Sequence, residues 1–343
     1  MNRYIIGSVA ALAALLMLAA CHHEPESDDK ESLDGSPSFS VPAYLRPGDV
    51  VDVDVTGVSH PKGEGLGIIW VETVSNAIDT VRTPSDPSSV STRYTFTIPD
   101  TTGTFVVRCS AYADGYYTST SSVNFTVVKT GLDESLSGRE IVASDPLIAD
   151  ERDGSGPKGE NVYYYATANG LDWMRNNLAY TGSGIPFRES EAMSYIFGRY
   201  YTWNEAQTAC PEGWRLPTDA EWTALASALT GRKYGELEPW NGAAGALMVN
   251  AYFNGTKMWE FWPEVKVTNA SDLSIIPAGY AIRADENKNF YGVFNYAVFW
   301  TADAAESDLA YYRYIYVKQP DVYLGVADRE SFSASVRCVR EAE

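Results

Sequence analysis

Apolar and polar side chains alternate along several segments between residues 37 and 129. In 51–55 three valines are separated by two aspartates, and the same period of two recurs in 94–98, 105–109 and 123–127. A period of two places successive side chains on opposite faces of a strand, so each segment predicts a strand with one buried face. Turns rich in Pro, Gly and Asp separate these segments, and the pattern therefore predicts an all-β sandwich over 37–129.

The pattern becomes helical in the stretch 198–225. An aromatic, extended segment is followed by a short helix that must end before Pro211, because proline cannot continue a helix. Thr218 then stands three residues before Glu221, which is the arrangement of a capping box. The stretch predicts strand, helix, turn, short strand and a second helix in close succession.

Residues 162–343 form a region of different composition. They hold eight of the nine tryptophans and many short apolar segments joined by irregular loops. We interpret 130–161, which is rich in glycine and turn residues, as a linker and lead-in. Tyr312, Tyr314 and Tyr316 alternate and share one face of a strand, but the pattern leaves open which face of that strand is core.

The first twenty residues have the pattern of a lipoprotein signal peptide. Arg3 supplies a positive charge, an apolar run follows over 4–18, and the run ends in Leu-Ala-Ala-Cys, which resembles a bacterial lipobox. Such a signal is cleaved before the cysteine, so Cys21 is the predicted lipid-attachment residue. The alternative is an ordinary secretory signal with an incidental cysteine. Several acyl chains on one residue would anchor the protein durably in a membrane.

Residues 21–36 are almost wholly polar and predict a flexible tether, because such a segment cannot bury enough apolar surface to become ordered. Their acidic patch, 27–31, resembles the export signals that send Bacteroidetes lipoproteins to the outer face of the outer membrane. We therefore expect a lipid-anchored protein of the outer membrane, exposed at the cell surface.

The charge of the chain excludes some partners. The net charge is −19, with 45 Asp and Glu against 26 Lys and Arg, and no basic cluster occurs. Nucleic acids and anionic membrane surfaces select for such clusters, so nucleic acid is not an expected partner. None of the three histidines lies in 162–343, which leaves no His-based triad or His-rich metal site there. A carboxylate pair for glycoside hydrolysis is the one catalytic class left open.

The segment 98–107 reads Ile-Pro-Asp-Thr-Thr-Gly-Thr-Phe-Val-Val. It resembles the end of a PKD-type domain, and this resemblance implies that the sandwich is Ig-like or PKD-like. Cys109 has no partner in this region. We expect a buried thiol that packs as a small apolar group, the alternative being a reactive thiol.

Four motifs in 162–343 carry a second resemblance: DWMRNNL, GRYYTWNEAQTACPEGWRLPTDAEWTAL, FWTA and SVRCVRE, in this order. Together they resemble the Fibrobacter succinogenes major paralogous domain, a family that looks related to the C-type-lectin-like fold and to formylglycine-generating enzymes. The family is common in surface lipoproteins and fimbria-associated proteins of Bacteroidetes. The resemblance implies an α+β C-type-lectin-like domain with a disulfide between Cys210 and Cys338, the alternative being two buried thiols.

The resemblance does not imply that this chain shares the copper or calcium sites of these related families. Formylglycine-generating enzymes bind copper through two closely spaced cysteines, and this region has only Cys210 and Cys338. Lectin calcium sites use a Glu-Pro-Asn tripeptide and an Asn-Asp pair, whereas 238–241 reads Glu-Pro-Trp-Asn and 299–302 has no such pair. We therefore expect a protein that is not an enzyme and that holds no metal or cofactor.

Aromatic and amide side chains of the loop-rich region 234–296 are the predicted ligand contacts, because such groups stack on sugars and anchor protein partners. The candidates are Trp240, Asn241, Trp259, Trp262, Tyr280, Asn287 and Tyr291. The alternative for each ring is that it fills a loop-rich core. The predicted function is adhesion or recognition of a glycan or a surface protein, with a fimbria-associated role among the options. The alternatives are a structural assembly subunit and a degenerate enzyme accessory in glycan handling.

Overall fold

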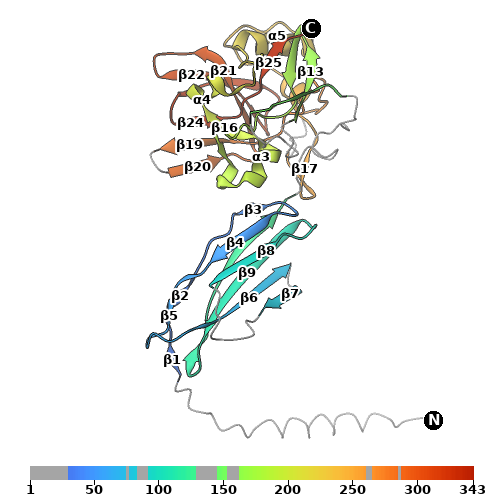
Figure 1. Ribbon diagram of the computed structural model, residues 1–343. Helices are drawn as coiled ribbons and strands as arrows, with labels where there is room; N and C mark the ends of the chain where they lie inside the picture. The colour runs from blue at the N-terminus through green and yellow to red at the C-terminus, as the bar shows by residue number, and fades with distance from the viewer. Residues whose placement is uncertain are drawn as a thin grey trace, which may run out of the picture.

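The computed structural model describes residues 30–74, 77–82, 92–128, 145–152, 162–259, 265–284 and 287–343, and the statements below concern these residues. The chain is rich in β-strands, as the sequence predicts. Figure 1 shows two bodies: an N-terminal unit, which we define as 31–128, and a larger head, which we define as 145–343. The predicted signal peptide, 1–20, and the predicted lipid-attachment residue Cys21 lie outside the described residues.

The N-terminal unit consists of strands. They are β1 (Glu31–Ser32), β2 (Asp34–Ser38), β3 (Tyr44–Leu45), β4 (Val50–Asp54), β5 (Thr56–Ser59), β6 (Gly67–Val74), β7 (Ala77–Arg82), β8 (Arg93–Thr97), β9 (Gly103–Tyr112), β10 (Tyr116–Tyr117) and β11 (Ser119–Val127). A five-stranded sheet has the order β3-β11-β9-β6-β7, and β4 pairs with β8, β2 with β5 and β1 with β10.

The alternating segments bury the face that the pattern predicts. Val51 and Val53 of β4, Phe96 of β8 and Val107 of β9 belong to one buried cluster. Trp70 of β6 stacks on Tyr94 of β8, with ring centroids 5.1 Å apart. Because the inward residues of the β4–β8 pair and of the five-stranded sheet share this cluster, the two sheets enclose a single core.

The N-terminal unit begins earlier than the sequence predicts. Glu31–Ser32 and Asp34–Ser38 are strands, whereas the sequence predicts a tether over 21–36. Leu33 is only 8% exposed and belongs to the buried cluster. One apolar residue in a polar segment carries almost no sequence signal, and its pairing with distant strands determines the boundary instead.

Cys109 is a free, buried cysteine, as expected. Its side chain lies in the core of the N-terminal unit, and burial raises the pKa of its thiol to about 12. The thiol is therefore protonated at neutral pH and poorly nucleophilic.

The head contains short strands and helices. The strands are β12 (Leu147–Ala149), β13 (Val162–Ala168), β14 (Leu171–Met174), β15 (Ile185–Pro186), β16 (Arg199–Thr202), β17 (Tyr252–Phe253), β18 (Thr256–Lys257), β19 (Tyr280–Ala284), β20 (Asn287–Tyr291), β21 (Tyr296–Ala304), β22 (Leu309–Tyr316), β23 (Val322–Asp328), β24 (Phe332–Ala334) and β25 (Val339–Glu341). The helices are η2 (Phe187–Glu189), α3 (Glu191–Phe197), α4 (Trp203–Ala209), α5 (Asp219–Thr230) and α6 (Ala244–Leu247).

Three sheets organise the head, in the orders β12-β13-β14-β25, β15-β16-β24-β19-β20 and β21-β22-β23, with a small β17–β18 hairpin. Since β12 pairs with β13, part of the predicted linker 130–161 belongs to the head. The remainder of that linker, 130–144 and 153–161, lies outside the described residues.

The stretch 198–225 folds largely as predicted, but the short strand expected before the second helix is only an isolated bridge between Arg215 and Val339. Strand β16 leads into α4, which ends at Cys210 before Pro211, and α5 follows. The Thr218 hydroxyl accepts a hydrogen bond from the backbone N–H of Glu221, and the Glu221 carboxylate accepts one from the N–H of Thr218, so the predicted capping box is confirmed. A second capping box at the start of α4 joins Thr202 and Glu205.

The disulfide between Cys210 and Cys338 is present, with the two Cα atoms 5.8 Å apart. It joins the residue after α4 to the segment just before β25, which are 128 residues apart in sequence. It therefore ties the C-terminal strand of the head to its first capped helix.

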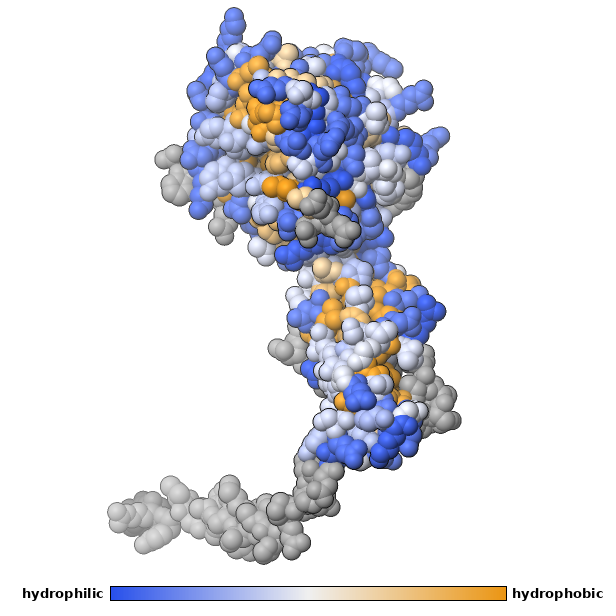
Figure 2. Space-filling view, turned by 90° about the vertical axis from the view of Figure 1, so that its left-hand side faces the viewer, coloured by the Kyte–Doolittle hydropathy of each residue, from blue (hydrophilic) through white to orange (hydrophobic). Residues whose placement is uncertain are grey.

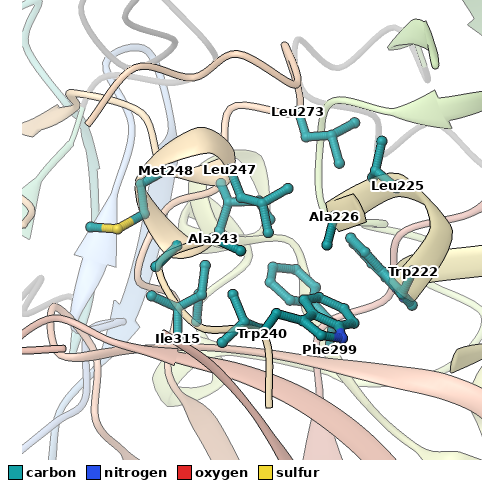
Figure 3. Close-up of a cluster of buried hydrophobic side chains, with 14 of the residues drawn as sticks. Trp222, Leu225, Ala226, Trp240, Ala243, Leu247, Met248, Leu273, Phe299 and Ile315 are labelled. Carbon is teal, nitrogen blue, oxygen red and sulfur yellow. The ribbon is translucent and has the colours of Figure 1, made fainter. Parts of the chain in front are cut away.

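A cluster of apolar side chains lies between α5, α6 and the β21–β23 sheet (Figure 3). Trp222 and Leu225 project from one face of α5, and Trp222 contacts Phe299 of β21 with ring centroids 5.8 Å apart. Trp173 of β14 also contacts Trp222, with ring centroids 4.6 Å apart. This cluster fixes α5 against the inner face of the sheet.

The N-terminal unit and the head share a packed interface. Tyr44 of β3 contacts Phe187 and Phe253 of the head, with ring centroids 5.8 and 6.5 Å apart. Its backbone carbonyl accepts a hydrogen bond from the Ser190 hydroxyl at 2.5 Å. Val128 is fully buried in the same cluster. The two bodies are therefore joined by side-chain packing and not by the chain alone.

We expect Tyr44→Ala to loosen this interface, because it removes the two ring contacts while leaving both cores intact. Each aromatic contact contributes about 0.5–1.5 kcal/mol beyond its buried area. Small-angle scattering should show a broader distribution of interdomain distances, with little change in the melting of either body. Tyr117→Ala is the control, since Tyr117 is 43% exposed and lies on β10 in the N-terminal unit. Unchanged scattering in Tyr44→Ala would contradict this view of the interface.

Candidate functional site

The two faces of β22 have different environments, which resolves the question that the sequence leaves open. Arg313 and Ile315 are each 1% exposed and face the core beneath the sheet. Tyr312, Tyr314 and Tyr316 project from the opposite face and are partly exposed. That face therefore presents a row of aromatic rings with hydroxyl groups.

These rings line a cleft of about 520 Å³, which we call the tyrosine cleft. Its tyrosines are Tyr280, Tyr296, Tyr312, Tyr314, Tyr316 and Tyr323, and its other lining residues are Ile282, Val298, Gln319 and Phe332. The volume lies within the range of about 300–1,000 Å³ that is usual for ligand sites. The residues come from β19, from the three-stranded sheet β21-β22-β23, from β24 and, for Gln319, from the turn between β22 and β23. Several segments distant in sequence therefore build the cleft.

Figure 1 places β19, β20, β21 and β22 along one side of the head, and Figure 2 views the molecule from that side. Hydrophilic residues cover much of this face of the head, with apolar patches between them.

Cross-strand stacking holds the rings of the tyrosine cleft in place. Tyr296 and Tyr316 are direct cross-strand partners, and their ring centroids lie 4.8 Å apart. Tyr314 and Tyr323 are partners in the same way, at 5.3 Å. Tyr312 stacks on Phe332 of β24 at 4.9 Å. Such cross-strand pairs stabilise a sheet and restrict the rotation of both side chains, so the surface is rigid before any ligand arrives.

Two glycines make this arrangement sterically possible. Gly325 is the cross-strand partner of Tyr312, and a Cβ atom at Gly325 would lie 2.2 Å from the tyrosine ring. Gly279 has a φ of +74°, and its N–H donates to the carbonyl of Tyr296 at 2.7 Å, which brings β19 alongside β21. A Cβ there would lie 2.3 Å from the backbone oxygen of Tyr291. Any other residue at either position would displace a wall of the cleft.

The tyrosine cleft is electrically neutral. None of its ten lining side chains carries a charge. Burial, with neighbouring tyrosines, raises the pKa of Tyr280, Tyr312 and Tyr314. At Tyr323 burial and the nearby Asp321 carboxylate raise the pKa. The hydroxyls are therefore neutral groups that can both donate and accept hydrogen bonds.

A buried ion pair supports the sheet from behind. The Nε and Nη2 atoms of Arg313 donate to the two carboxylate oxygens of Asp219 at 2.6 and 2.8 Å, and both side chains are at most 3% exposed. The Arg313 guanidinium also lies 4.1 Å from the ring centroid of Trp240 and donates to the carbonyl of Glu238 at 2.6 Å. This pair links the first turn of α5 to the centre of β22.

Two of the predicted ligand contacts, Trp240 and Trp259, are core residues. Trp240 is fully buried against Arg313, and Trp259 is fully buried in the same apolar cluster, where its Nε1 donates to the carbonyl of Ile275. The exposure that ligand contact requires is therefore absent at both rings. Trp262 lies outside the described residues.

The other predicted contacts fall in two places. Tyr280 lines the tyrosine cleft, and Tyr291, which is 43% exposed, stacks on it at 5.6 Å. Asn287 lies on the neighbouring strand β20 and pairs with Ala284. Asn241 is exposed elsewhere, and its backbone carbonyl accepts hydrogen bonds from Arg232 and Tyr234. The structure thus brings Tyr280 and Tyr291 together and leaves Asn241 apart.

The sequence does not identify most of the cleft as a site. It places Tyr312, Tyr314 and Tyr316 on one strand face, but Tyr296 and Tyr323 carry no signal of their own. The useful signal was the row of tyrosines on one strand, because a core-facing row in a globular domain is more often aliphatic.

Two further observations concern the described residues. They contain no group of three or more His, Cys, Asp or Glu side chains placed to hold a metal ion. Across the same ranges, no helix combines the length and the apolar character needed to cross a membrane.

Comparison with known protein families gives a match over most of the head. The family model for the Fibrobacter succinogenes major domain matches residues 167–340, which covers β14 to β24, the disulfide and the whole tyrosine cleft. No curated protein matches the chain.

Proposed function

Because the chain belongs to the Fibrobacter succinogenes major domain family, we propose that its head is a non-enzymatic recognition domain that binds a ligand in the tyrosine cleft. The ligand is a glycan or a surface protein, and the function of the protein is adhesion or recognition. The observation that carries this proposal is the cleft itself: six tyrosines from four strands, fixed by stacking, around a hollow of about 520 Å³. Preformed aromatic surfaces of this kind bind with little loss of conformational freedom.

The finer fold assignment belongs to the same proposal. The head is C-type-lectin-like, and a disulfide from the end of an early helix to the segment before the last strand supports that assignment. The N-terminal unit is an Ig-like or PKD-like sandwich, supported by its two sheets around one core. In this arrangement the sandwich is a spacer and the head carries the site.

The protein is a lipoprotein of the outer membrane, anchored through Cys21 and exposed at the cell surface. The lipobox-like residues 18–21 and the acidic segment after them support this location. Mass spectrometry of the protein from membranes tests it: an acylated Cys21 is expected as the first residue, and an intact or differently cleaved N-terminus would contradict the anchor.

Binding should depend on the cleft. On an array of neutral and charged glycans and surface-protein peptides, Tyr314→Ala should weaken binding about tenfold, since one stacked ring contributes about 1 kcal/mol or more. Gly325→Val should have a similar effect, because the added side chain displaces Tyr312. Tyr117→Ala is the matched control at an exposed tyrosine outside the head. Binding that is equally strong in both cleft variants, or an array without a single bound member, would contradict the proposal, and release of sugar from a bound glycan would contradict its non-enzymatic part.

The affinity should not change with pH between about pH 6 and pH 9. An ordinary tyrosine has a pKa of about 10. In the cleft the pKa is raised further at Tyr280, Tyr312, Tyr314 and Tyr323. A raised pKa favours the protonated hydroxyl, so the hydroxyls lose their protons only above this window. Isothermal titration with any cleft ligand checks this, and an affinity that falls with pH inside the window would point to a different binding group.

A further inference from the structure

We infer that the tyrosine cleft selects an uncharged, hydroxyl-rich ligand, namely a neutral pyranose oligosaccharide. This inference rests on the proposed function and narrows it from a glycan or a protein to one chemical class. Three features of the cleft carry it: its free hydroxyls, its stacked rings and its lack of charge.

The hydroxyls are available for a ligand. Among the described residues, no protein group is hydrogen-bonded to the hydroxyl of Tyr280, Tyr296, Tyr312 or Tyr314, although all four side chains line the cleft. Elsewhere in the head, Tyr200 and Tyr201, which are buried, donate their hydroxyls to backbone carbonyls. The cleft therefore concentrates hydroxyl groups that the fold does not use. The amide of Gln319 adds a further donor and acceptor.

The rings favour a ligand with weakly polar faces. Tyr296 and Tyr316, like Tyr314 and Tyr323, cover one another on one side, which leaves each pair with limited free ring surface beside its hydroxyls. The C–H groups of a pyranose ring can pack against such a ring surface, while the sugar hydroxyls can hydrogen-bond to the tyrosine hydroxyls beside it. A cation would instead require several ring faces turned toward one point, and stacking turns these faces toward each other.

The absence of charge in the cleft excludes ionic ligands. A sugar acid or a sulfated sugar is normally held by Arg or Lys, and none lines the cleft. The Asp321 carboxylate lies beside Tyr323 and raises the pKa of that tyrosine. Together with a net charge of −19, it repels anions. A cationic sugar would have no carboxylate among the lining residues to pair with.

Three sets of hexasaccharides matched in size test the inference on the intact chain. The neutral set is cellohexaose, maltohexaose, mannohexaose and chitohexaose, the anionic probe is hexagalacturonate, and the cationic probe is the deacetylated form of chitohexaose. Decaproline is added because extended proline-rich peptides also dock in aromatic grooves. Isothermal titration measures each affinity.

We expect at least one neutral hexasaccharide to bind about tenfold or more tightly than either charged probe and than decaproline. Its affinity should change less than about twofold between low and high salt, because no ion pair forms. Tyr314→Ala should lower it about tenfold, and Tyr314→Phe, which removes one hydroxyl, should lower it several-fold. Tyr311→Phe is the matched control, since Tyr311 lies on the same strand and faces the other side of the sheet. Circular dichroism confirms that each variant is folded.

If a charged probe or decaproline binds as tightly as the neutral sugars and loses this binding in Tyr314→Ala, that result would overturn this inference and leave the proposed function intact. Tight binding of a neutral sugar that Tyr314→Ala leaves unchanged, or no cleft-dependent binding of any probe, would overturn both.

Discussion

Arg313→Met is expected to lower the free energy of unfolding of the head by about 3–5 kcal/mol, because it leaves a buried carboxylate without its counter-charge. Asp219 is 2% exposed, and Arg313 supplies both of its charged hydrogen bonds. The other donors to the Asp219 carboxylate are the backbone N–H of Leu237, at 2.9 Å, and the Thr223 hydroxyl, at 3.5 Å. Two uncharged donors do not offset the loss of a bidentate guanidinium.

Denaturant unfolding followed by tryptophan fluorescence measures this effect, because eight of the nine tryptophans lie in the head. Arg215→Met is the matched control. Arg215 pairs with Glu221 of the same helix, but its side chain is 46% exposed, so its loss should change the free energy of unfolding by less than about 1 kcal/mol. If the two variants lose the same free energy of unfolding, the burial of the Arg313–Asp219 pair does not explain its contribution to stability.

Removal of the disulfide is the second large effect. The double variant Cys210→Ser, Cys338→Ser should lose about 5 kcal/mol, since the bond closes a loop of 128 residues and so restricts the unfolded chain. The head, with its short elements and long loops, should unfold at a much lower denaturant concentration. The N-terminal unit should unfold as before, because its cysteine, Cys109, is not part of the bond.

Two measurements make this prediction specific. A reductant added to the wild-type protein should reproduce the shift in the unfolding midpoint of the head, and it should have no effect on the double variant. Under native conditions with the disulfide intact, a thiol reagent should label Cys109 slowly, because the side chain is buried. A midpoint of the head that does not respond to reductant would show that the disulfide contributes little.

Features that depend on neighbouring residues were predictable from the sequence. Thr218 and Glu221 form their capping box because both partners lie within one turn of helix. The valines of β4 are buried because the period of two decides which face they share. The disulfide followed from the family resemblance and not from spacing, since 128 residues separate its two cysteines.

Features that depend on tertiary contacts were not predictable. Trp240 is followed by Asn241 and Gly242 in a turn-rich segment, so its sequence context is that of an exposed loop. Its burial is decided by Arg313, which lies 73 positions further along the chain. The sequence also does not show which face of β22 is exposed, because each face of that strand contains rings or long side chains. The packing of α5 on the face that carries Arg313 shows that the tyrosine face is the open one.

The position of β3 and β11 has a mechanical consequence. The chain enters the N-terminal unit at β1, at the end far from the head, and leaves it after β11 beside β3, at the end next to the head (Figure 1). A pull between the N-terminus and a bound head would thus run along the strands, and would load the backbone hydrogen bonds between them in shear. Bonds loaded in shear must break together, whereas bonds loaded in peeling break one at a time. The two ends of this unit are placed to resist tension.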